Sequence, residues 1–399
     1  MASPIVCVLK GKDPKDGVRI AVDYRYLNKY CKGDAIPMPG IPDLIQRVGG
    51  ARYISLYDIK SAYHQLAVRS DHQWLTAFVW DGGLYEYTRA PFGQKGSRNT
   101  FLRAVQQVLH PIRKFTASFV DDIAVYSNEF ERHLVELEQF LQVIKNSGFT
   151  LNLKKCRFAQ NQCKFVGHII GSGERKPDPE KVATVRHMKV PETKKQLRRL
   201  IGFFSYFGEY IPNFTEIAQP LTELTGKRIP NQIPWGDKEN NAFEQLKEKL
   251  CEAASQSLQI ADFTQPFVIE VDSDMGTVGA ALLQTNENKA NRPIAFASQK
   301  LTPTQRRWST IEKEAFAAIW ALERFRNFTF AQPVTLYSDH NPLTYITESA
   351  TKSAKLMRWA MALQQYNVTF CFKSGRQNLV ADCLSRLDPD DGSTLSEVQ

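Results

Sequence analysis

The chain has 399 residues, of which 43% are hydrophobic and 23% charged, a composition typical of a globular protein with two or three domains. No apolar run approaches the roughly 18 to 20 residues that span a bilayer, and the N-terminus lacks the basic and apolar segments of a secretory signal. The formal net charge is +9, and residues 1–170 carry 23 Lys and Arg against 15 Asp and Glu. This first part therefore has the basic excess expected of a domain that binds a polyanion, although many basic surfaces are simply solvated.

Seven cysteines are scattered along the chain, and none of them form a C-x-x-C pair. This pattern argues against zinc ribbons and against a disulfide framework. It predicts reduced thiols and an intracellular protein.

The first expected element is a hairpin of two strands at 5–10 and 18–22, joined by a turn that contains Lys10 and Lys12. Arg19 lies on its second arm. Such a hairpin could place cations over a triphosphate, although basic hairpin tips are usually just exposed to solvent. Three prolines then precede a short helix at about 42–48.

A strand is expected at 53–59, with Asp58 near its end, where a lone Asp is more often a helix cap than a metal ligand. A second hairpin should pair 75–80 with 84–87. The loop that follows holds Phe92 and Gly93 and opens a helix that runs to about residue 109. Backbone amides at a helix start suit an anionic or nucleotide ligand, but the same pattern describes a plain loop-to-helix junction.

Asp121 and Asp122 lie between two apolar runs, in a pattern typical of a strand, a tight turn and a strand. Neighbouring strand residues point to opposite faces, so these two carboxylates share a face only if the turn redirects one of them. Close together they would repel each other, and a divalent cation would remove that repulsion. An ordinary Asp-rich turn is the alternative.

A helix at about 129–146 has four apolar residues at helical spacing: Leu134, Leu137, Leu141 and Ile144. A strand at 150–153 and the basic pair Lys154 and Lys155 should follow. Residues 165–170 then form one arm of a hairpin closed by 171–173.

The middle of the chain is predicted to be helical. Asp178 should cap one helix and a Thr193–Gln196 capping box the next. The second of these helices has an apolar face and a basic face, and the basic face consists of Lys194, Lys195, Arg198 and Arg199. A basic face can follow a phosphate backbone, although solvation explains most such faces. A third helix is expected at about 238–252.

From residue 266 the pattern changes to strands at 267–272, 279–284 and 293–299, a helix at 310–328 and a strand at 333–338. Two short helical stretches, a strand at 367–373 and a helix at 378–386 complete the region. The order predicts a mixed sheet with helices packed on it.

Four carboxylates occupy unusual places in this region. Asp272 and Asp339 end strands, and Asp382 lies at the start of the last helix. Glu312 has a structural role as the partner of Ser309 in a capping box, but Glu314 has none. Its helix face continues with Ala317, Ala318 and Ala321, which suit close packing on a sheet. Each acid alone resembles a cap or a surface charge, but four together would suit two divalent cations about 3.5 to 4 Å apart.

Four motifs in order resemble those of reverse transcriptases: Val22–Lys29, Leu56–Gln65, Pro91–Gly93 and Phe119–Asp122. Residues 266–387 resemble the ribonuclease H domain that follows in the Pol polyprotein of LTR retrotransposons. Segments Phe165–His168, Leu200–Phe204 and Asn378–Arg386 are similar to the gypsy-type lineage.

The resemblance implies an α+β multidomain fold, with the fingers, palm and thumb of a right-hand polymerase and a mixed α/β ribonuclease H-like domain. The fingers and palm would cover 1–170, with fingers truncated at the N-terminus, and a helical thumb or connection would cover 171–255. The ribonuclease H-like domain would cover 256–387, before a disordered acidic tail at 388–399.

The resemblance also implies roles for individual residues and cofactors. The polymerase site would use Asp58, Asp121 and Asp122, and the ribonuclease H site Asp272, Glu314, Asp339 and Asp382. Each site would hold two Mg²⁺ ions, which Mn²⁺ could replace. Nucleotide-binding residues would be Lys10, Lys12, Arg19, Tyr63 as steric gate, Phe92, Gly93 and Lys155. Primer or template would contact Val166, Gly167, Lys194, Lys195, Arg198 and Arg199.

The implied partners are an RNA template, a DNA primer, an RNA–DNA hybrid and deoxynucleoside triphosphates, with a homodimer as a further expectation and no membrane partner. The implied location is the cytoplasm, within virus-like particles when the full polyprotein is made. Most relatives have Pro where this chain has Arg98, so we expect an intact palm with weakened template binding.

Three alternatives remain. A host-retained relic that only binds nucleic acid would fit the truncation and Arg98. A cellular or non-LTR reverse transcriptase is disfavoured by the directly attached ribonuclease H domain. A plant pararetrovirus polymerase is closer because it has both domains.

Overall fold

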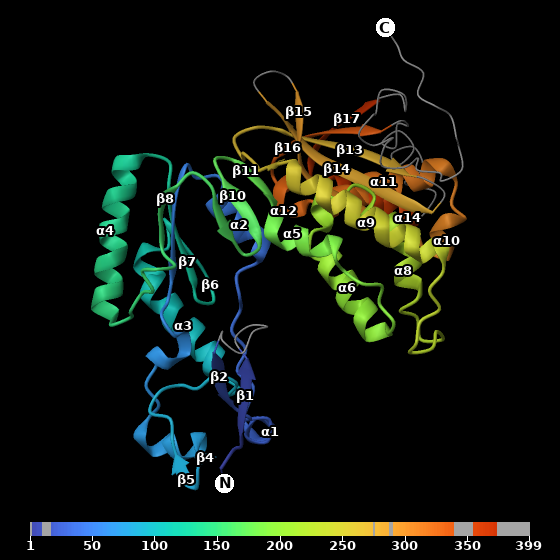
Figure 1. The fold of residues 1–399 in the computed structure, drawn as a ribbon. Helices are drawn as coiled ribbons and strands as arrows, with labels where there is room; N and C mark the ends of the chain where they lie inside the picture. The colour runs from blue at the N-terminus through green and yellow to red at the C-terminus, as the bar shows by residue number, and fades with distance from the viewer. Residues whose placement is uncertain (1, 10–16, 274–275, 287–289, 339–353, 373–399) are drawn as a thin grey trace. The chain divides into compact units, whose positions relative to one another are not determined.

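The computed structural model describes residues 2–9, 17–273, 276–286, 290–338 and 354–372 (Figure 1). The chain divides into two compact units. The first unit comprises Met1–Val166 with Ile170–Gly173, and the second comprises Gly167–Ile169 with Glu174–Gln399. None of the helices in the described ranges is long and apolar enough to cross a membrane.

The first unit is built on a four-stranded sheet of order β6-β7-β3-β8. Its strands are β3 (Tyr53–Asp58), β6 (Thr116–Phe119), β7 (Asp122–Ser127) and β8 (Arg157–Gln160). Helices α3 (Ser97–Leu109) and α4 (Phe130–Ser147) pack on it through a core that includes Phe101, Ile123 and Phe140, all fully buried.

Smaller elements precede and interrupt this sheet. They are the antiparallel hairpin β1 (Ile5–Leu9) and β2 (Val18–Val22), helices α1 (Leu27–Tyr30) and α2 (Ile41–Gly49), and the hairpin β4 (Phe78–Trp80) and β5 (Gly83–Tyr85). Short 3₁₀ helices cover Ala62–Gln65, Ser70–Thr76 and His110–Ile112. Strands β9 (Cys163–Phe165) and β10 (His168–Gly171) follow the sheet in the chain.

Two predicted strands in this unit were wrong in part, because side chains satisfy backbone groups that a strand would have paired. Residues 75–77 are not strand, since the Thr76 hydroxyl donates to Gln73 O (2.7 Å) and accepts from Tyr87 N (2.8 Å). Residues 150–153 form only an isolated bridge, in which Lys60 N donates to Thr150 O (2.9 Å), because the Gln65 side chain accepts from Thr150 N (2.7 Å).

The buried face of α4 matches the predicted apolar face only in part: Ile144 is buried and Leu137 packs against the core, but Leu141 is exposed. The buried residues are His133, Glu136, Phe140 and Ile144, whereas Leu134 is half-exposed. Polar groups on the sheet select this face, as described below.

The second unit begins with a helical region. It contains β11 (Glu174–Pro177), which pairs antiparallel with β12 (Leu258–Gln259), and helices α5 (Pro179–Arg186), α6 (Lys194–Tyr206), α7 (Phe214–Ile217), α8 (Gln219–Glu223) and α9 (Asp237–Ser255). The cap at Asp178 and the Thr193–Gln196 capping box are both confirmed. The apolar face of α6 is buried in the helical core, where Leu197 and Phe204 have no exposed surface.

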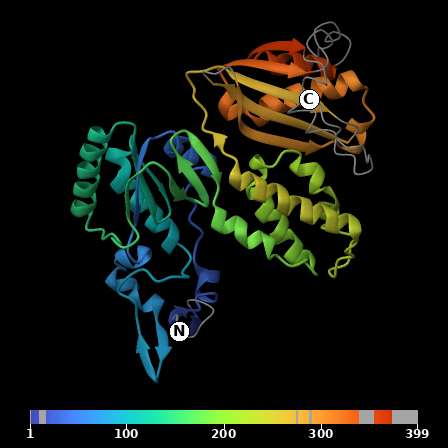
Figure 2. The same cartoon turned by 45° about the horizontal axis from the view of Figure 1, so that its top comes forward.

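A five-stranded mixed sheet of order β15-β14-β13-β16-β17 completes the second unit (Figure 2). Its strands are β13 (Phe267–Ser273), β14 (Thr277–Thr285), β15 (Asn291–Lys300), β16 (Pro333–Ser338) and β17 (Asn367–Phe372). The first three are antiparallel, and β16 and β17 run parallel to β13. The described helices of this part are α10 (Pro303–Arg306), α11 (Thr310–Arg324), α12 (Arg326–Thr329) and α14 (Ala354–Leu363). The predicted mixed sheet with packed helices is confirmed.

A buried histidine stabilises the helical region. His168 Nδ1 lies 2.9 Å from the Tyr210 hydroxyl, and Nε2 lies 3.2 Å from the Tyr206 hydroxyl. Burial, and then the charges of Arg175 and Lys181, lowers the pKa of His168 to about 3. The folded protein therefore keeps this ring neutral where an exposed imidazole would be charged.

We expect this histidine to make stability depend on pH. The unfolded chain binds a proton at His168 below about pH 6.5, whereas the folded protein binds it only near pH 3. The stabilisation is therefore complete above pH 6.5 and is lost progressively toward pH 3, by roughly 5 kcal/mol over the whole range. His168→Gln should flatten the fall in unfolding free energy between pH 6.5 and 4, measured by denaturant titration. His187→Gln, at an exposed position, should leave the slope unchanged; equal slopes for all three proteins would contradict the prediction.

Candidate active sites

The turn between β6 and β7 presents the two adjacent acids. Phe119 pairs with Asp122, so Val120 and Asp121 are the two central residues of a tight hairpin. Val120 has φ +60°, a left-handed backbone that is rare for a β-branched residue and that primed hairpin turns normally fill with Gly or Asn. Strain of this kind costs on the order of 1–3 kcal/mol and persists where the surrounding structure enforces it.

The strand pairing brings the third acid to the same place. Asp58 at the end of β3 is the direct cross-strand partner of Asp122, and Ile59 N donates to Asp121 O (3.2 Å). Three carboxylates, from two stretches of sequence more than 60 residues apart, therefore meet at one end of the sheet.

The carboxylates influence one another's charge. The surrounding protein desolvates Asp122, and this effect, followed by the charges of Asp121 and Asp58, raises the pKa of Asp122 to about 6. Lys155 Nζ donates to Asp58 Oδ2 (2.9 Å), and this bond raises the pKa of Lys155. Lys155 thus offsets part of the repulsion among the three carboxylates.

Hard divalent cations prefer carboxylate oxygens, so this donor set and its mutual repulsion fit such an ion. Asp58, Asp121 and Asp122 are the residues that would hold it. In the described parts of the chain, no three His, Cys, Asp or Glu side chains are already gathered closely enough to hold a metal. An ion that binds Asp58 would replace Lys155, which donates to this carboxylate.

Two aromatic rings pack on Tyr63, the predicted steric gate. Tyr63 packs on Phe92 (ring centres 5.1 Å apart) and on Phe101 (5.5 Å). Burial raises the pKa of Tyr63, while the charge of Arg98 lowers it and the charge of Asp121 raises it. The loop behind Phe92 is held by Asn28, whose side chain donates to Gly93 O (2.9 Å) and accepts from Lys95 N (2.7 Å).

Other predicted nucleotide and primer residues are less fully described. Lys10 and Lys12 lie outside the described residues, and Arg19 is seen only as the backbone partner of Val8 in the β1–β2 hairpin. Val166 and Gly167 form the turn after β9, and both have left-handed backbones (φ +47° and +82°).

The predicted basic face of α6 is partly used within the protein. Lys194 Nζ donates to Gly226 O (2.7 Å), and Arg198 Nη2 donates to Thr225 O (3.3 Å). Lys195 and Arg199 are exposed. Half of the expected phosphate-tracking cations are therefore engaged with backbone carbonyls.

In the second unit, Glu314 lies between the ends of two parallel strands. It is 1% exposed and accepts hydrogen bonds from Ser273 Oγ (2.5 Å) and Ser338 Oγ (3.1 Å). Ser273 directly follows Asp272, and Ser338 directly precedes Asp339. The small face of α11 (Ala317, Ala318 and Ala321) is fully buried, as predicted, and this close approach brings Glu314 to the sheet.

Asp339 and Asp382 lie outside the described residues. Because β13 and β16 are parallel, their carboxyl ends share one edge of the sheet. Asp272 and Glu314 therefore lie at the edge of the sheet where β16 ends, and Asp339 is the next residue of the chain after β16.

The sequence did not reveal a buried polar cluster behind the first site. His133 Nε2 lies 2.8 Å from Ser55 Oγ, and Nδ1 lies 2.9 Å from Ser127 Oγ, which also donates to Glu136. Ala159 N donates to Ser55 Oγ (2.9 Å). The cluster joins α4 to three strands of the sheet: β3, which ends at Asp58, β7, which begins at Asp122, and β8, which follows Lys155 in the chain. Serines facing inward from apolar strands were the available signal.

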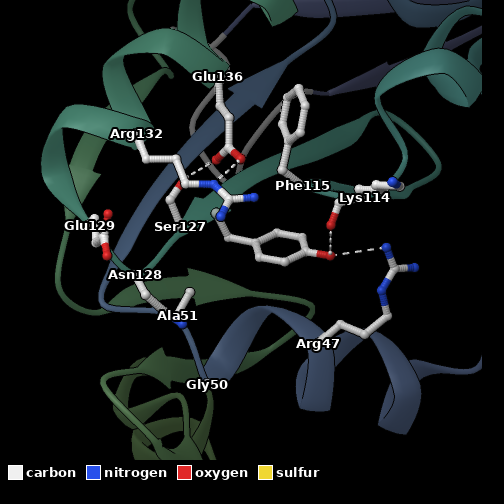
Figure 3. Close-up of a pocket in the computed structure, with 11 residues that line it drawn as sticks. Arg47, Gly50, Ala51, Lys114, Phe115, Ser127, Asn128, Glu129, Arg132 and Glu136 are labelled. Atoms are coloured by element: carbon white, nitrogen blue, oxygen red, sulfur yellow. Dashed lines mark hydrogen bonds and ion pairs between the residues drawn. The ribbon is translucent and has the colours of Figure 1, made fainter.

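A cavity of about 470 Å³ lies beside this cluster (Figure 3). Arg132 Nε donates to Glu136 Oε1 (2.9 Å), and Arg47 Nη2 donates to the Tyr126 hydroxyl (3.0 Å). The walls of the cavity include the end of β7 at Ser127, whereas the acidic turn precedes the start of β7 at Asp122. This cavity is therefore separate from the candidate catalytic acids.

We expect Val120→Gly to raise the free energy of unfolding by roughly 1 kcal/mol, because glycine adopts the left-handed backbone without strain. Any activity that depends on Asp121 should fall, because this side chain becomes less ordered. Ala331→Gly relieves a similar backbone (φ +60°) at an exposed position of the second unit and should stabilise without changing activity. Denaturant unfolding and activity assays measure both effects, and a Val120→Gly protein with unchanged stability would contradict the assigned strain.

Comparisons with known proteins agree with this geometry. Residues 9–170 match the family model of reverse transcriptases (RNA-dependent DNA polymerases), and residues 262–366 match an RNase H-like domain found in reverse transcriptases. The retrovirus-related Pol polyprotein from transposon opus of Drosophila melanogaster is 33% identical over 402 residues, covering 97% of this chain and 40% of the relative. That from transposon gypsy of the same organism is 31% identical over 379 residues, covering 92% and 36%.

Solved structures show the same fold. The foamy viral protease-reverse transcriptase in complex with double-stranded DNA superposes with a TM-score of 0.81 at 24% identity, over 94% of this chain and 78% of that one. The complex of that viral protein with an RNA/DNA hybrid superposes with a TM-score of 0.73 at 24% identity, over 100% and 53%.

Residues 9–170 therefore belong to the reverse transcriptase family, and residues 262–366 to the RNase H-like domains found in reverse transcriptases. The chain belongs to the family of retrovirus-related Pol polyproteins of gypsy-type LTR retrotransposons, and it spans about two fifths of the length of the curated relatives described above.

Proposed function

We propose that the chain is an RNA- and DNA-directed DNA polymerase with ribonuclease H activity, which copies retroelement RNA into DNA and degrades the RNA of the resulting hybrid. The observation that carries this proposal is the coincidence of two family matches with two separate acid clusters, one at the β6–β7 turn and one at the edge of the β13–β16 pair. Both families act with divalent metal ions.

In the polymerase reaction, the primer 3′-oxygen forms a bond to the α-phosphorus of a deoxynucleoside triphosphate, and the bond to the pyrophosphate oxygen breaks. Asp58, Asp121 and Asp122 would hold two Mg²⁺ ions, which activate the attacking hydroxyl and stabilise the leaving group. Tyr63, supported by Phe92 and Phe101, would exclude a ribose 2′-hydroxyl. Lys155, released from Asp58, would give a proton to the pyrophosphate. Lys10, Lys12 and Arg19 would contact the triphosphate.

In the ribonuclease H reaction, water attacks a phosphodiester of the RNA strand and the 3′-oxygen of the preceding ribose leaves. Asp272, Glu314, Asp339 and Asp382 would hold the metal ions. Ser273 and Ser338 would orient the Glu314 carboxylate through their hydroxyl groups.

The proposed partners are an RNA template, a DNA primer, the hybrid and deoxynucleoside triphosphates. The names of two foamy viral complexes, with double-stranded DNA and with an RNA/DNA hybrid, support nucleic-acid binding by this fold. A homodimer and a cytoplasmic location within virus-like particles belong to the same proposal.

The test is extension of a labelled DNA primer on an RNA template with Mg²⁺, together with cleavage of labelled RNA in a hybrid. Both activities should appear with the chain as given and disappear with a chelator. Binding of the primed template without either activity would instead identify a relic that only binds nucleic acid. Arg98, whose guanidinium lies 3.1 Å from Met38 Sδ, is the residue to restore to Pro if template binding is weak.

A further inference from the structure

The cavity beside the buried polar cluster of the first unit is not used by either proposed reaction (Figure 3). Its volume of about 470 Å³ lies within the ~300–1,000 Å³ range of small-molecule sites. The charged residues in its lining are Arg47, Lys114, Glu129, Arg132 and Glu136. We call this space the palm cavity. A hollow lined by charges of both signs suits a ligand that carries a negative group and also hydrogen-bond donors.

Arg47 brings a fixed positive charge to the palm cavity. Its Nη2 donates to Arg113 O (2.9 Å), Thr116 O (3.1 Å) and the Tyr126 hydroxyl (3.0 Å). All three acceptors are uncharged oxygens, so they hold the guanidinium in place without cancelling its charge. Within the part of the chain that the structure describes, no carboxylate forms an ion pair with Arg47. An anchored cation of this kind is preorganised for an anion.

Lys114 adds a second positive charge close to the first. Its carbonyl oxygen accepts from the Tyr126 hydroxyl (3.3 Å), which also accepts from Arg47, so one tyrosine links the two basic residues. Figure 3 shows Lys114 and Arg47 on one side of the cavity, with Arg132 and Glu136 on the other. The Lys114 side chain is exposed and forms no hydrogen bond or ion pair to the described residues. Two neighbouring cations without a carboxylate partner favour a bound anion.

The opposite side of the palm cavity carries the acids. Glu136 is buried, and both of its oxygens are engaged: Oε1 accepts from Arg132 Nε (2.9 Å) and Oε2 from the Ser127 hydroxyl. Glu129 is exposed, and its side chain makes no capping bond to α4. The hydrogen bond to Glu136, and more weakly the charge of Glu129, raises the pKa of Arg132. Two acids therefore compensate this arginine, and this side of the cavity suits hydroxyl or amino groups rather than an anion.

We propose that the palm cavity binds a small molecule with a phosphate at one end and hydroxyl or amino groups at the other, the chemistry of a nucleoside monophosphate. The phosphate lies with Arg47 and Lys114, since guanidinium and ammonium groups donate charge-assisted hydrogen bonds to phosphate oxygens. Glu129 and Glu136 accept from the groups at the far end. The half-buried Tyr126 ring adds apolar surface to the lining. This site is independent of the two acid clusters and of the reactions proposed for them.

The test is isothermal titration calorimetry of the full chain with adenosine 5′-monophosphate in EDTA, which removes divalent ions from both acid clusters. Arg47→Gln and Lys114→Gln should each weaken binding by about 10- to 100-fold, the range for loss of a hydrogen bond to a charged group. Glu129→Gln should strengthen binding by about 2- to 5-fold, because Gln keeps an acceptor oxygen but removes a charge that repels the phosphate. Adenosine, which has no phosphate, should not bind, and inorganic phosphate should compete.

Arg52→Gln and Lys145→Gln are the matched controls and should bind the nucleotide like the unaltered chain. Arg52, like Arg47, is exposed and lies over a tyrosine ring (5.6 and 6.0 Å to the ring centres). Lys145, like Lys114, is exposed, and neither control residue lines the cavity. Because the Lys114 side chain has no contact within the described residues to lose, its variant tests the site even if Arg47→Gln unfolds.

Equal affinity in all these variants, or no binding up to about 10 mM nucleotide, would overturn the inference. Displacement of the bound nucleotide by a blunt DNA duplex would also overturn it, by identifying the two cations as a contact for a nucleic-acid backbone. Because the measurement is made without divalent ions, binding at this site can hold even if the polymerase and ribonuclease H proposals fail.

Discussion

Asp121→Asn is expected to lower primer extension by at least about a thousandfold, because it removes one of three carboxylates proposed to hold both metal ions; a factor of this size corresponds to about 4 kcal/mol of transition-state stabilisation. The side chain keeps its size, and the change removes a charge that raises the pKa of Asp122. The fold should therefore be retained or slightly stabilised. Single-nucleotide extension on a primed RNA template, with thermal unfolding in parallel, measures both effects.

Two controls accompany this prediction. Asp71→Asn removes a surface carboxylate that pairs with Arg69 and should leave extension unchanged. Cleavage of a pre-formed hybrid should also remain, since it depends on the second acid cluster. Extension within tenfold of the unaltered chain would remove Asp121 from the polymerase site.

Glu314→Gln is expected to abolish hybrid cleavage, by at least about a thousandfold, while primer extension continues. Glu314 is the buried carboxylate that the Ser273 and Ser338 hydroxyls orient at the edge of the sheet. The Gln amide can hydrogen-bond to both hydroxyls, so the helix should keep its position. Cleavage of end-labelled RNA in a hybrid is the measurement.

Glu323→Gln on the exposed part of the same helix is the matched control and should cleave normally. Glu314→Gln and Asp121→Asn together form a double dissociation: each substitution should remove one activity and leave the other. Parallel loss of both activities in either variant would contradict the assignment of two independent sites.

Sequence reasoning predicted the elements of this protein well where local signals were strong. The capping box at Thr193 and the adjacent acids in the hairpin turn follow from short-range chemistry, since a cap or a tight turn needs only a few neighbouring residues. It failed at residues 150–153, where the distant Gln65 side chain accepts the Thr150 N–H that a longer strand would have paired.

The buried face of α4 shows the same limit. Apolar spacing favoured Leu134 and Leu141, which are exposed, whereas the sheet buries His133 and Glu136, because two inward-facing serines need hydrogen-bond partners. The periodicity of a helix indicates an apolar face, whereas the polar groups opposite it can select another.

Residue types and their spacing are enough to predict which chemistry is present: the seven acids, the order of the motifs and the alternation of helices and strands. Which groups share a site depends on tertiary contacts. Strand register places Asp58 opposite Asp122, a small helix face lets Glu314 reach the sheet, and Asn28 holds the loop at Gly93 and Lys95. These are contacts between residues far apart in the chain, and their distances depend on packing, which no local pattern encodes.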